Sequence, residues 1–130
     1  MNKLISILLV FQFSGCWNDV VQAQEFSNVQ IVNAIYLAEG GINATYAYGI
    51  RSVHYSTKSE ARRIAFRTVE NNKKRFEKYG YRLYPSFIQF LGSRFCPTTG
   101  RDRSESEIRL NQYWVKNVMY YLNHPKVVKK

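Results

Sequence analysis

Residues 57–80 read TKSEARRIAFRTVENNKKRFEKYG and predict the clearest helix of the chain. Thr57 and Glu60 have the spacing of a capping box, and Gly80 is placed to end the helix. The side chains that recur along one face are Ala61, Ile64, Ala65, Thr68, Val69, Phe76 and Tyr79. This stripe predicts an amphipathic helix with one face turned toward a core.

The opposite face of this helix is charged. Its residues are Arg63, Arg67, Glu70, Lys73, Lys74 and Glu77. Such a mixture is typical of a solvated surface with spaced ion pairs. Asn72 interrupts the apolar face, where an amide needs hydrogen-bond partners. Asn72 could reach a catalytic group or a substrate hydroxyl, or it could tie two helices together.

Another helix is predicted before it, running to about Ala38. Ser27 or Asn28 can cap its start, and Gly40 and Gly41 are placed to end it. Its apolar face consists of Val29, Val32, Ile35 and Tyr36. This helix therefore also has a side that can pack in a core.

Two further helices are predicted toward the C-terminus. Pro85 suits the first turn of one helix, and Pro97 ends it. After a polar loop over residues 98–107, the last helix begins near Asn111 and ends at Pro125. The apolar faces consist of Phe87, Ile88, Leu91 and Phe95 in one helix and of Trp114, Val118, Tyr121 and Leu122 in the other.

These elements fit one small domain. The chain has 130 residues, which is the usual size of a single domain. Residues 42–55 are rich in Tyr, Ala and Gly and predict a loop or a short hairpin. We therefore expect a mainly α domain over residues 24–125, with four or five helices and at most a short hairpin, followed by a basic tail over residues 126–130.

Residues 1–23 have the pattern of an export signal. A short positive start precedes an apolar run over residues 4–13, which is too short to span a bilayer comfortably. Small residues favour cleavage ahead of Gln24. The alternative is a lipoprotein signal that ends before Cys16 and leaves the protein anchored to a membrane. Both predict an exported protein, in the periplasm or outside the cell.

The chain is strongly basic. Nineteen Lys and Arg side chains against nine Asp and Glu give a formal net charge of +10. This charge favours polyanionic surroundings, such as nucleic acid, anionic lipid or an anionic cell wall. Because export argues against a role on nucleic acid, we expect no nucleic acid partner and favour anionic cell-wall polymers.

Cysteine and histidine are sparse. Cys16 would leave with the signal or become lipidated, so Cys96 would have no partner for an intramolecular disulfide. His54 and His124 lie far apart in the sequence and do not make a ligand cluster with one thiol. We therefore expect no metal site and no cofactor.

Glu39 is the strongest candidate for chemistry. It falls on the apolar face at the C-terminal end of the first predicted helix, where desolvation and the negative helix pole both favour a protonated carboxyl. A carboxyl that holds its proton is what a general acid for a glycosidic oxygen requires. The alternative is a structural ion pair with Arg51 or Arg94.

Two short strings frame this residue: residues 36–41 read YLAEGG, and residues 48–53 read YGIRSV. Together they resemble the start of the lysozyme-like superfamily, notably the lytic transglycosylases. Those proteins end a core helix in Glu followed by Ser or Gly, and then present a Gly-Leu-Met-Gln-like turn. The later strings that resemble small bacterial and phage transglycosylase-like proteins are residues 68–72, 90–97 and 111–118. The resemblance implies a lysozyme-like fold.

The resemblance also implies an activity on peptidoglycan. Glu39 would act as the single general acid and base at the bond between N-acetylmuramic acid and N-acetylglucosamine. The sugar's own hydroxyl would replace water and give an anhydro-sugar end. The candidate substrate-binding residues are Tyr46, Tyr48, Ser52 and Asn72. The two tyrosines could stack on sugar rings or belong to the core, and Arg51 and Ser52 replace the Met and Gln that are usual in the family.

Two other functions stay open. A muramidase, which is a hydrolytic lysozyme, would use a second carboxylate, and the sequence offers no obvious one. A non-catalytic cell-wall or polyanion binder of the same fold would need no acid at all. In each case we expect a monomer whose partners are peptidoglycan glycan strands.

Overall fold

Helices form the regular structure of this protein. The computed structural model describes residues 25–95 and 105–125, without the side chain of Glu107. Its α-helices are α1 (Asn28–Ala38), α2 (Lys58–Lys78), α3 (Phe87–Phe95) and α4 (Glu105–Asn123). Its short 3₁₀ turns are η1 (Gly41–Asn43), η2 (Ala47–Gly49) and η3 (Gly80–Arg82). These ranges contain no strand, which confirms the predicted mainly helical class.

The segment between α1 and α2 folds as consecutive turns. The Gly49 N–H donates to the Tyr46 carbonyl at 3.0 Å, and the Ala47 N–H donates to the Tyr55 hydroxyl at 2.8 Å. The N–H groups of Ala47 and Gly49 in η2 therefore bond to nearby residues and form no strand pairing. Of the two structures predicted for residues 42–55, the loop is correct and the short hairpin is wrong.

The starts of the first two helices are capped by side chains. Ser27 and Gln30 form a reciprocal capping box at α1, with N···O distances of 3.2 and 2.8 Å. At α2 the Glu60 N–H donates to the Thr57 hydroxyl at 3.1 Å, as predicted. The Glu60 carboxylate, however, accepts from the Ser56 N–H at 2.9 Å instead of closing the box on Thr57. Both caps satisfy N–H groups that have no partner inside a helix.

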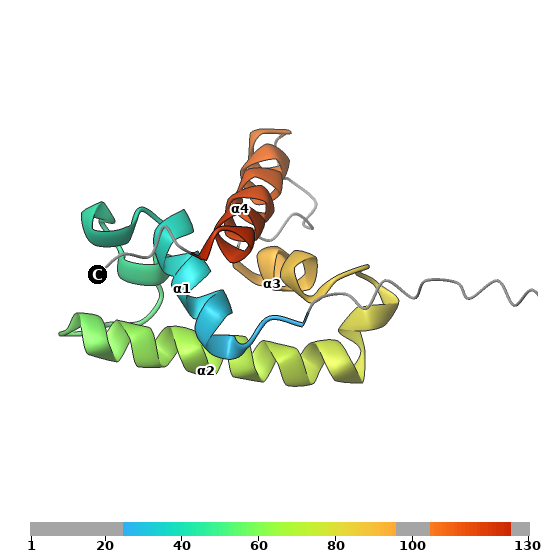
Figure 1. Cartoon of the computed structure of the whole chain (residues 1–130), viewed down its shortest axis with the longest axis horizontal. Coiled ribbons are helices and arrows are strands. Elements are labelled where there is room, and N and C mark those ends of the chain that lie inside the picture. The colour runs from blue at the N-terminus through green and yellow to red at the C-terminus, as the bar shows by residue number, and fades with distance from the viewer. Residues whose placement is uncertain (1–24, 96–104, 126–130) are drawn as a thin grey trace, which may run out of the picture.

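α1 lies at the centre of the core. It crosses α2, which runs along the lower edge of Figure 1, and it also packs against α4. The residues of α1 that are buried are Ile31, Val32, Ala34 and Ile35. Val29 is 48% exposed, so its predicted place on the buried face is wrong. Because α1 is covered by two helices, its buried arc extends around to Ile31 and Ala34.

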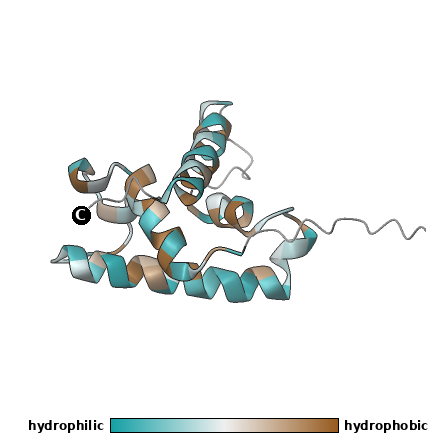
Figure 2. Ribbon diagram, viewed as in Figure 1, coloured by the Kyte–Doolittle hydropathy of each residue, from teal (hydrophilic) through white to brown (hydrophobic). Residues whose placement is uncertain are grey.

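α2 is amphipathic, as its sequence predicts. Ala61, Ala65 and Val69 are buried together with Asn72, whereas Tyr79 at the end of the stripe is 40% exposed. Figure 2 shows that hydrophilic residues cover most of this helix. Its exposed basic residues are Lys58, Arg63, Arg67, Lys74, Arg75 and Lys78. One long helix thus supplies both a wall of the core and much of the basic surface.

α3 and α4 pack closely against each other. A Cβ added to Gly92 would lie 2.7 Å from Val115 Cγ2, and the Asn111 amide donates to the Gly92 carbonyl at 2.8 Å.

The predicted starts of α3 and α4 are wrong. Pro85 precedes the first turn of α3, whose start is capped by the Ser86 hydroxyl, and α4 begins at Glu105 and not near Asn111.

Several expectations concern residues outside the described ranges. They are the export signal over residues 1–23, the lipoprotein alternative at Cys16, the thiol of Cys96, the helix end at Pro97 and the basic tail over residues 126–130. Within the described ranges, no helix is both long enough and apolar enough to span a membrane.

Candidate functional site

A cleft of about 790 Å³ lies where α1 ends. It is bordered by the loop that follows η2, by α2, by the end of α3 and by α4. Glu39, Ser52 and Asn72, three of the predicted site residues, line this cleft. The structure therefore brings together residues from three separate stretches of the sequence.

Glu39 is placed by the end of helix α1. It is the C-cap residue, and its backbone N–H donates to the Ile35 carbonyl at 3.0 Å. The chain then turns at Gly40, which has a φ of 106° that is favourable only for glycine. The cap keeps the backbone of Glu39 attached to the helix while its half-buried side chain lines the cleft.

Trp114 of α4 holds the carboxylate of Glu39. Its indole N–H donates to Glu39 Oε1 at 2.7 Å, and the ring stacks on Phe95 with centroids 5.0 Å apart. Trp114 is only 7% exposed. Because two helices and an aromatic stack fix the indole, the hydrogen bond gives the carboxylate a defined orientation.

The sequence predicts Trp114 as a core residue, and the structure adds this second role. The two bonded residues are 75 positions apart, so no local pattern could pair them. The available signal was chemical: a buried indole N–H needs an acceptor, and Glu39 was the acidic residue predicted on an apolar face.

Gly49 packs directly against the same carboxylate. A Cβ added at Gly49 would lie 2.6 Å from Glu39 Cδ and 2.7 Å from Oε1. Gly49 also has a φ of 69°, which other residues adopt with strain. The carboxyl group of Glu39 therefore packs against the backbone of the Tyr-Gly-Ile turn, at a position where any side chain would overlap it.

The two predicted stacking residues do not line the cleft. Tyr48 is 5% exposed, and its ring lies 5.2 Å from that of Tyr36 in the core. Tyr46 is 45% exposed, and the Arg51 guanidinium lies 5.2 Å from the centre of its ring. For Tyr48 the structure favours the core alternative, because a buried ring cannot stack on a sugar.

Asn72 is buried at the inner wall of the cleft. It is 3% exposed, and its amide nitrogen donates to the Thr68 carbonyl at 2.9 Å. Its oxygen accepts from the Arg75 guanidinium at 3.4 Å. Both partners belong to α2, so Asn72 does not tie two helices together by hydrogen bonds. Its amide is satisfied, as a buried polar group requires.

The charges around the cleft are unequal. Among its described lining residues Glu39 is the one acid, whereas Arg51, Arg75 and Arg94 are cations. In the described part of the chain, no basic side chain lies within 4.0 Å of the Glu39 carboxylate. The ion pair with Arg51 or Arg94 that the sequence left open is therefore not formed.

The hydrogen bond from Trp114 distinguishes the two carboxyl oxygens. An indole nitrogen can only donate, so Oε1 must act as the acceptor. A carbonyl oxygen accepts a hydrogen bond better than a hydroxyl oxygen does, so the bond from Trp114 favours the protonated form of Glu39 that has its proton on Oε2. No donor from the described residues is bonded to Oε2, which leaves this atom available to a ligand. The arrangement is suited to proton transfer at one defined oxygen.

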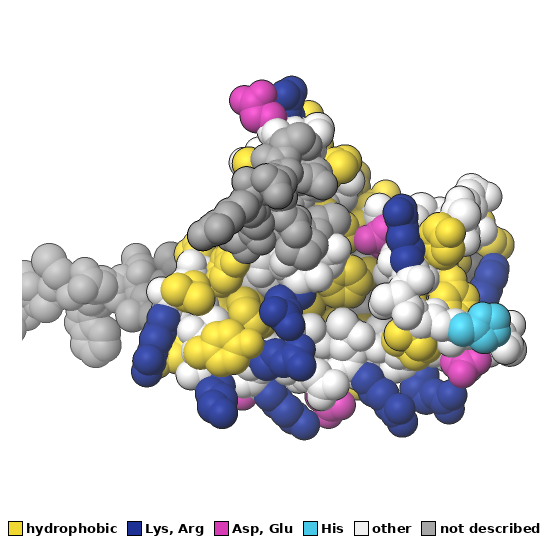
Figure 3. All heavy atoms as spheres, turned by 180° about the vertical axis from the view of Figure 1, so that it is seen from behind, with side chains coloured by type: hydrophobic (Ala, Val, Ile, Leu, Met, Phe, Trp, Pro, Cys, Tyr) yellow, Lys and Arg dark blue, Asp and Glu magenta, His cyan; other side chains and the backbone are white. Residues whose placement is uncertain are grey.

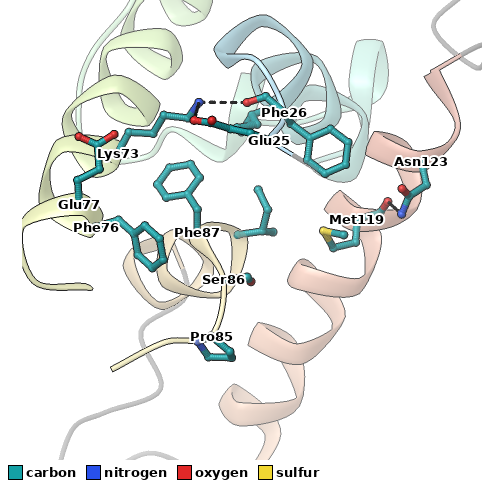
Figure 4. A pocket seen from close by; sticks show the side chains of 12 residues that line it. Glu25, Phe26, Lys73, Phe76, Glu77, Pro85, Ser86, Phe87, Met119 and Asn123 are labelled. Atoms are coloured by element: carbon teal, nitrogen blue, oxygen red, sulfur yellow. Dashed lines mark hydrogen bonds and ion pairs between the residues drawn. The ribbon is translucent and has the colours of Figure 1, made fainter. Parts of the chain in front are cut away.

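A second cavity, of about 500 Å³, lies at the other end of α1 (Figure 4). Phe26, Phe76 and Phe87 contribute aromatic rings to it, and Met119 faces it from α4. Lys73 closes one side, because its ammonium donates to the Phe26 carbonyl at 3.0 Å. This cavity is mainly apolar, and it is lined by none of the predicted site residues.

The described residues contain no group of three His, Cys, Asp or Glu side chains that could hold a metal ion. Comparison with known protein families, with curated proteins and with solved structures finds no significant match to this chain.

Proposed function

We propose that this protein has a lysozyme-like fold and acts as an exported lytic transglycosylase on peptidoglycan. The observation that carries the proposal is the carboxylate of Glu39, which lines a cleft, accepts the Trp114 N–H at 2.7 Å and has no ion pair with a described residue. A structural carboxylate on a basic protein would ordinarily be paired with a cation.

The proposed reaction uses the two protonation states of Glu39. Its Oε2 proton passes to the glycosidic oxygen as the bond to the anomeric carbon breaks. The resulting carboxylate then takes a proton from the sugar's own hydroxyl, whose oxygen attacks the same carbon. The products are a new hydroxyl on the leaving sugar, an anhydro-sugar end and a Glu39 that carries its proton again.

The single acid favours a transglycosylase over a muramidase. A hydrolytic enzyme with two carboxylates holds them about 5–10 Å apart across the bond. No second acid is found among the described residues that line the cleft. Glu60 caps α2, and Glu70 and Glu77 are exposed on that helix. An internal hydroxyl as nucleophile removes the need for a second carboxylate.

The basic surface supports an anionic cell wall as the place of action. Figure 3, a view from behind, shows Lys and Arg side chains along the edge formed by α2. These charges would hold the protein near wall polymers without contacting the bond that is cleaved. A protein that only binds the wall would use the same surface but would have no use for a carboxylate that lines the cleft without a cation beside it.

The proposal is tested by incubating peptidoglycan sacculi with the purified protein and its Glu39→Gln variant, followed by mass spectrometry of the soluble fragments. We expect anhydro-muropeptides from the unchanged protein and none from E39Q. Glu77→Gln is the matched control, because Glu77 is exposed on α2 and does not line the cleft. Fragments with reducing ends would indicate a muramidase instead, and the absence of fragments would leave a wall-binding protein.

A further inference from the structure

We propose that the cleft selects glycan strands whose peptide side chains carry free carboxylates, and that Arg51, Arg75 and Arg94 determine this selectivity. The inference rests on the proposed function and specifies its substrate class. It concerns acidic groups attached beside the bond that is cleaved, not the reacting sugars themselves.

The three arginines reach the cleft from three different segments. Arg51 follows η2, Arg75 belongs to α2 and Arg94 belongs to α3. All three are exposed. Positive charge therefore borders the cleft on several sides, while Glu39 is the one acid among its described lining residues. A cleft with this balance attracts anionic ligands and favours them over neutral ligands.

None of these arginines has a carboxylate partner among the described residues. Other basic side chains do: Arg63 lies 4.0 Å from Glu60, and Arg109 lies 3.5 Å from Glu105. The contacts of the cleft arginines are weaker. Arg75 shares one N–H with Asn72 at 3.4 Å, and Arg51 lies over the ring of Tyr46. Each guanidinium therefore keeps most of its five donors for a ligand.

Guanidinium groups bind carboxylates through two parallel hydrogen bonds. A ligand carboxylate placed directly at Glu39 would repel it, so the acidic groups must sit to the sides of the reacting bond. A glycan with acidic peptide branches meets this requirement because its sugars are neutral at the bond and its charges lie on the branches. A plain neutral glycan would leave all three arginines without partners.

The test compares two ligands that differ only in charge. One is a peptidoglycan tetrasaccharide with free carboxylates on its peptides, and the other is the same compound with those carboxylates converted to amides. Calorimetric titration of the E39Q protein measures binding without turnover. We expect the acid form to bind about tenfold more tightly, and we expect this preference to fall to about twofold in the R75Q/R94Q variant.

Arg82→Gln with Arg109→Gln is the matched control, because it also removes two charges, both side chains are exposed, and neither lines the cleft. It should leave the preference unchanged. Equal binding of the two ligands, failure of both to bind, or an equal loss of the preference in R82Q/R109Q would overturn the inference.

Cleavage by the unchanged protein separates this inference from the proposed function. A protein that prefers the acid form but releases no fragments would contradict the proposed activity and support the charge selectivity. A protein that cleaves and binds the acid and amide forms equally well would support the activity and contradict the selectivity.

Discussion

At the scale of single residues, Gly49 has the most constrained position in the site. A Cβ there would lie 2.6 Å from Glu39 Cδ. Gly41 is a matched control, because its φ of 59° is close to the 69° of Gly49, and its added Cβ would lie at ordinary contact distances of 3.7 Å from Tyr36 and 3.9 Å from Leu37. The two positions therefore share backbone strain and differ in the contact with the carboxylate.

We predict that Gly41→Ala lowers the free energy of unfolding by about 1 kcal/mol, and that Gly49→Ala lowers it by about 2–4 kcal/mol because overlap adds to strain. Urea denaturation measures both. Gly49→Ala should also abolish fragment release from sacculi, since Glu39 must move. If the two variants lost equal stability, Gly49 would have no specific contact with Glu39.

Trp114→Phe tests the hydrogen bond to the carboxylate. Phe keeps a ring that can stack on Phe95 but lacks the N–H. We predict that kcat falls about tenfold and that KM changes by less than about threefold, because the bond orients the acid and does not contact the sugar. Assays on soluble peptidoglycan fragments separate the two constants.

The stability of the same variant gives a second measurement. In a double-mutant cycle of unfolding free energies with Glu39→Ala, the coupling between Trp114 and Glu39 should be about 1–2 kcal/mol. Additive losses would mean that the indole contributes only through packing.

At the scale of elements, the contact between α3 and α4 positions Trp114. A Cβ at Gly92 would lie 2.7 Å from Val115 Cγ2 and 3.3 Å from Trp114 Cε3. We predict that Gly92→Ala lowers the free energy of unfolding by about 1–2 kcal/mol, because overlap outweighs the better helix propensity of alanine. Gly92→Ala should also reduce fragment release, because the added Cβ displaces Trp114. Gly92→Ala with Val115→Ala should relieve the closest overlap and recover part of this loss. If the single variant were more stable than the unchanged protein, the helices would be less closely packed than described.

The sequence predicted the helical segments that have a buried apolar face. It missed the first turns of α4, which have no such face. The buried residues of α4 are Trp114, Val118 and Leu122. Its first turns contain Glu105 and Arg109, an exposed i,i+4 ion pair, and the exposed Leu110. Apolar periodicity cannot reveal a helix that projects beyond the core, which explains why its start was predicted six residues late at Asn111.

The sequence likewise predicted some residues of the site and missed the contacts between them. Glu39 could be found because helix, acid and glycines are adjacent in the sequence. Gly49 was part of the predicted turn, but its contact with Glu39 depends on how η2 folds back. The hydrogen bond from Trp114 to Glu39 forms only because α4 packs against α1. Contacts between distant segments are set by tertiary packing, which a local pattern does not contain.

At the scale of the whole molecule, α2 contributes a row of exposed Lys and Arg side chains to one edge of the surface (Figure 3). We predict that Arg67→Gln with Lys74→Gln weakens binding to sacculi severalfold at low salt, with a smaller effect at high salt because ions screen exposed charges. Cosedimentation over a range of salt concentrations measures this. The control is Arg109→Gln with Lys116→Gln, which removes the same charge from α4. Equal losses of binding in the two double variants would mean that binding depends on net charge and not on the surface of α2.

The bond between Trp114 and Glu39 has an optical consequence. Trp17 and Trp114 are the two tryptophans of the chain. In a Trp17→Phe variant, all tryptophan emission would therefore come from an indole that touches the candidate acid and lines the cleft. Indole emission depends on nearby charge and water. The protein thus carries its own fluorophore where a ligand would arrive, and occupancy of the cleft can be followed by light without any label or turnover.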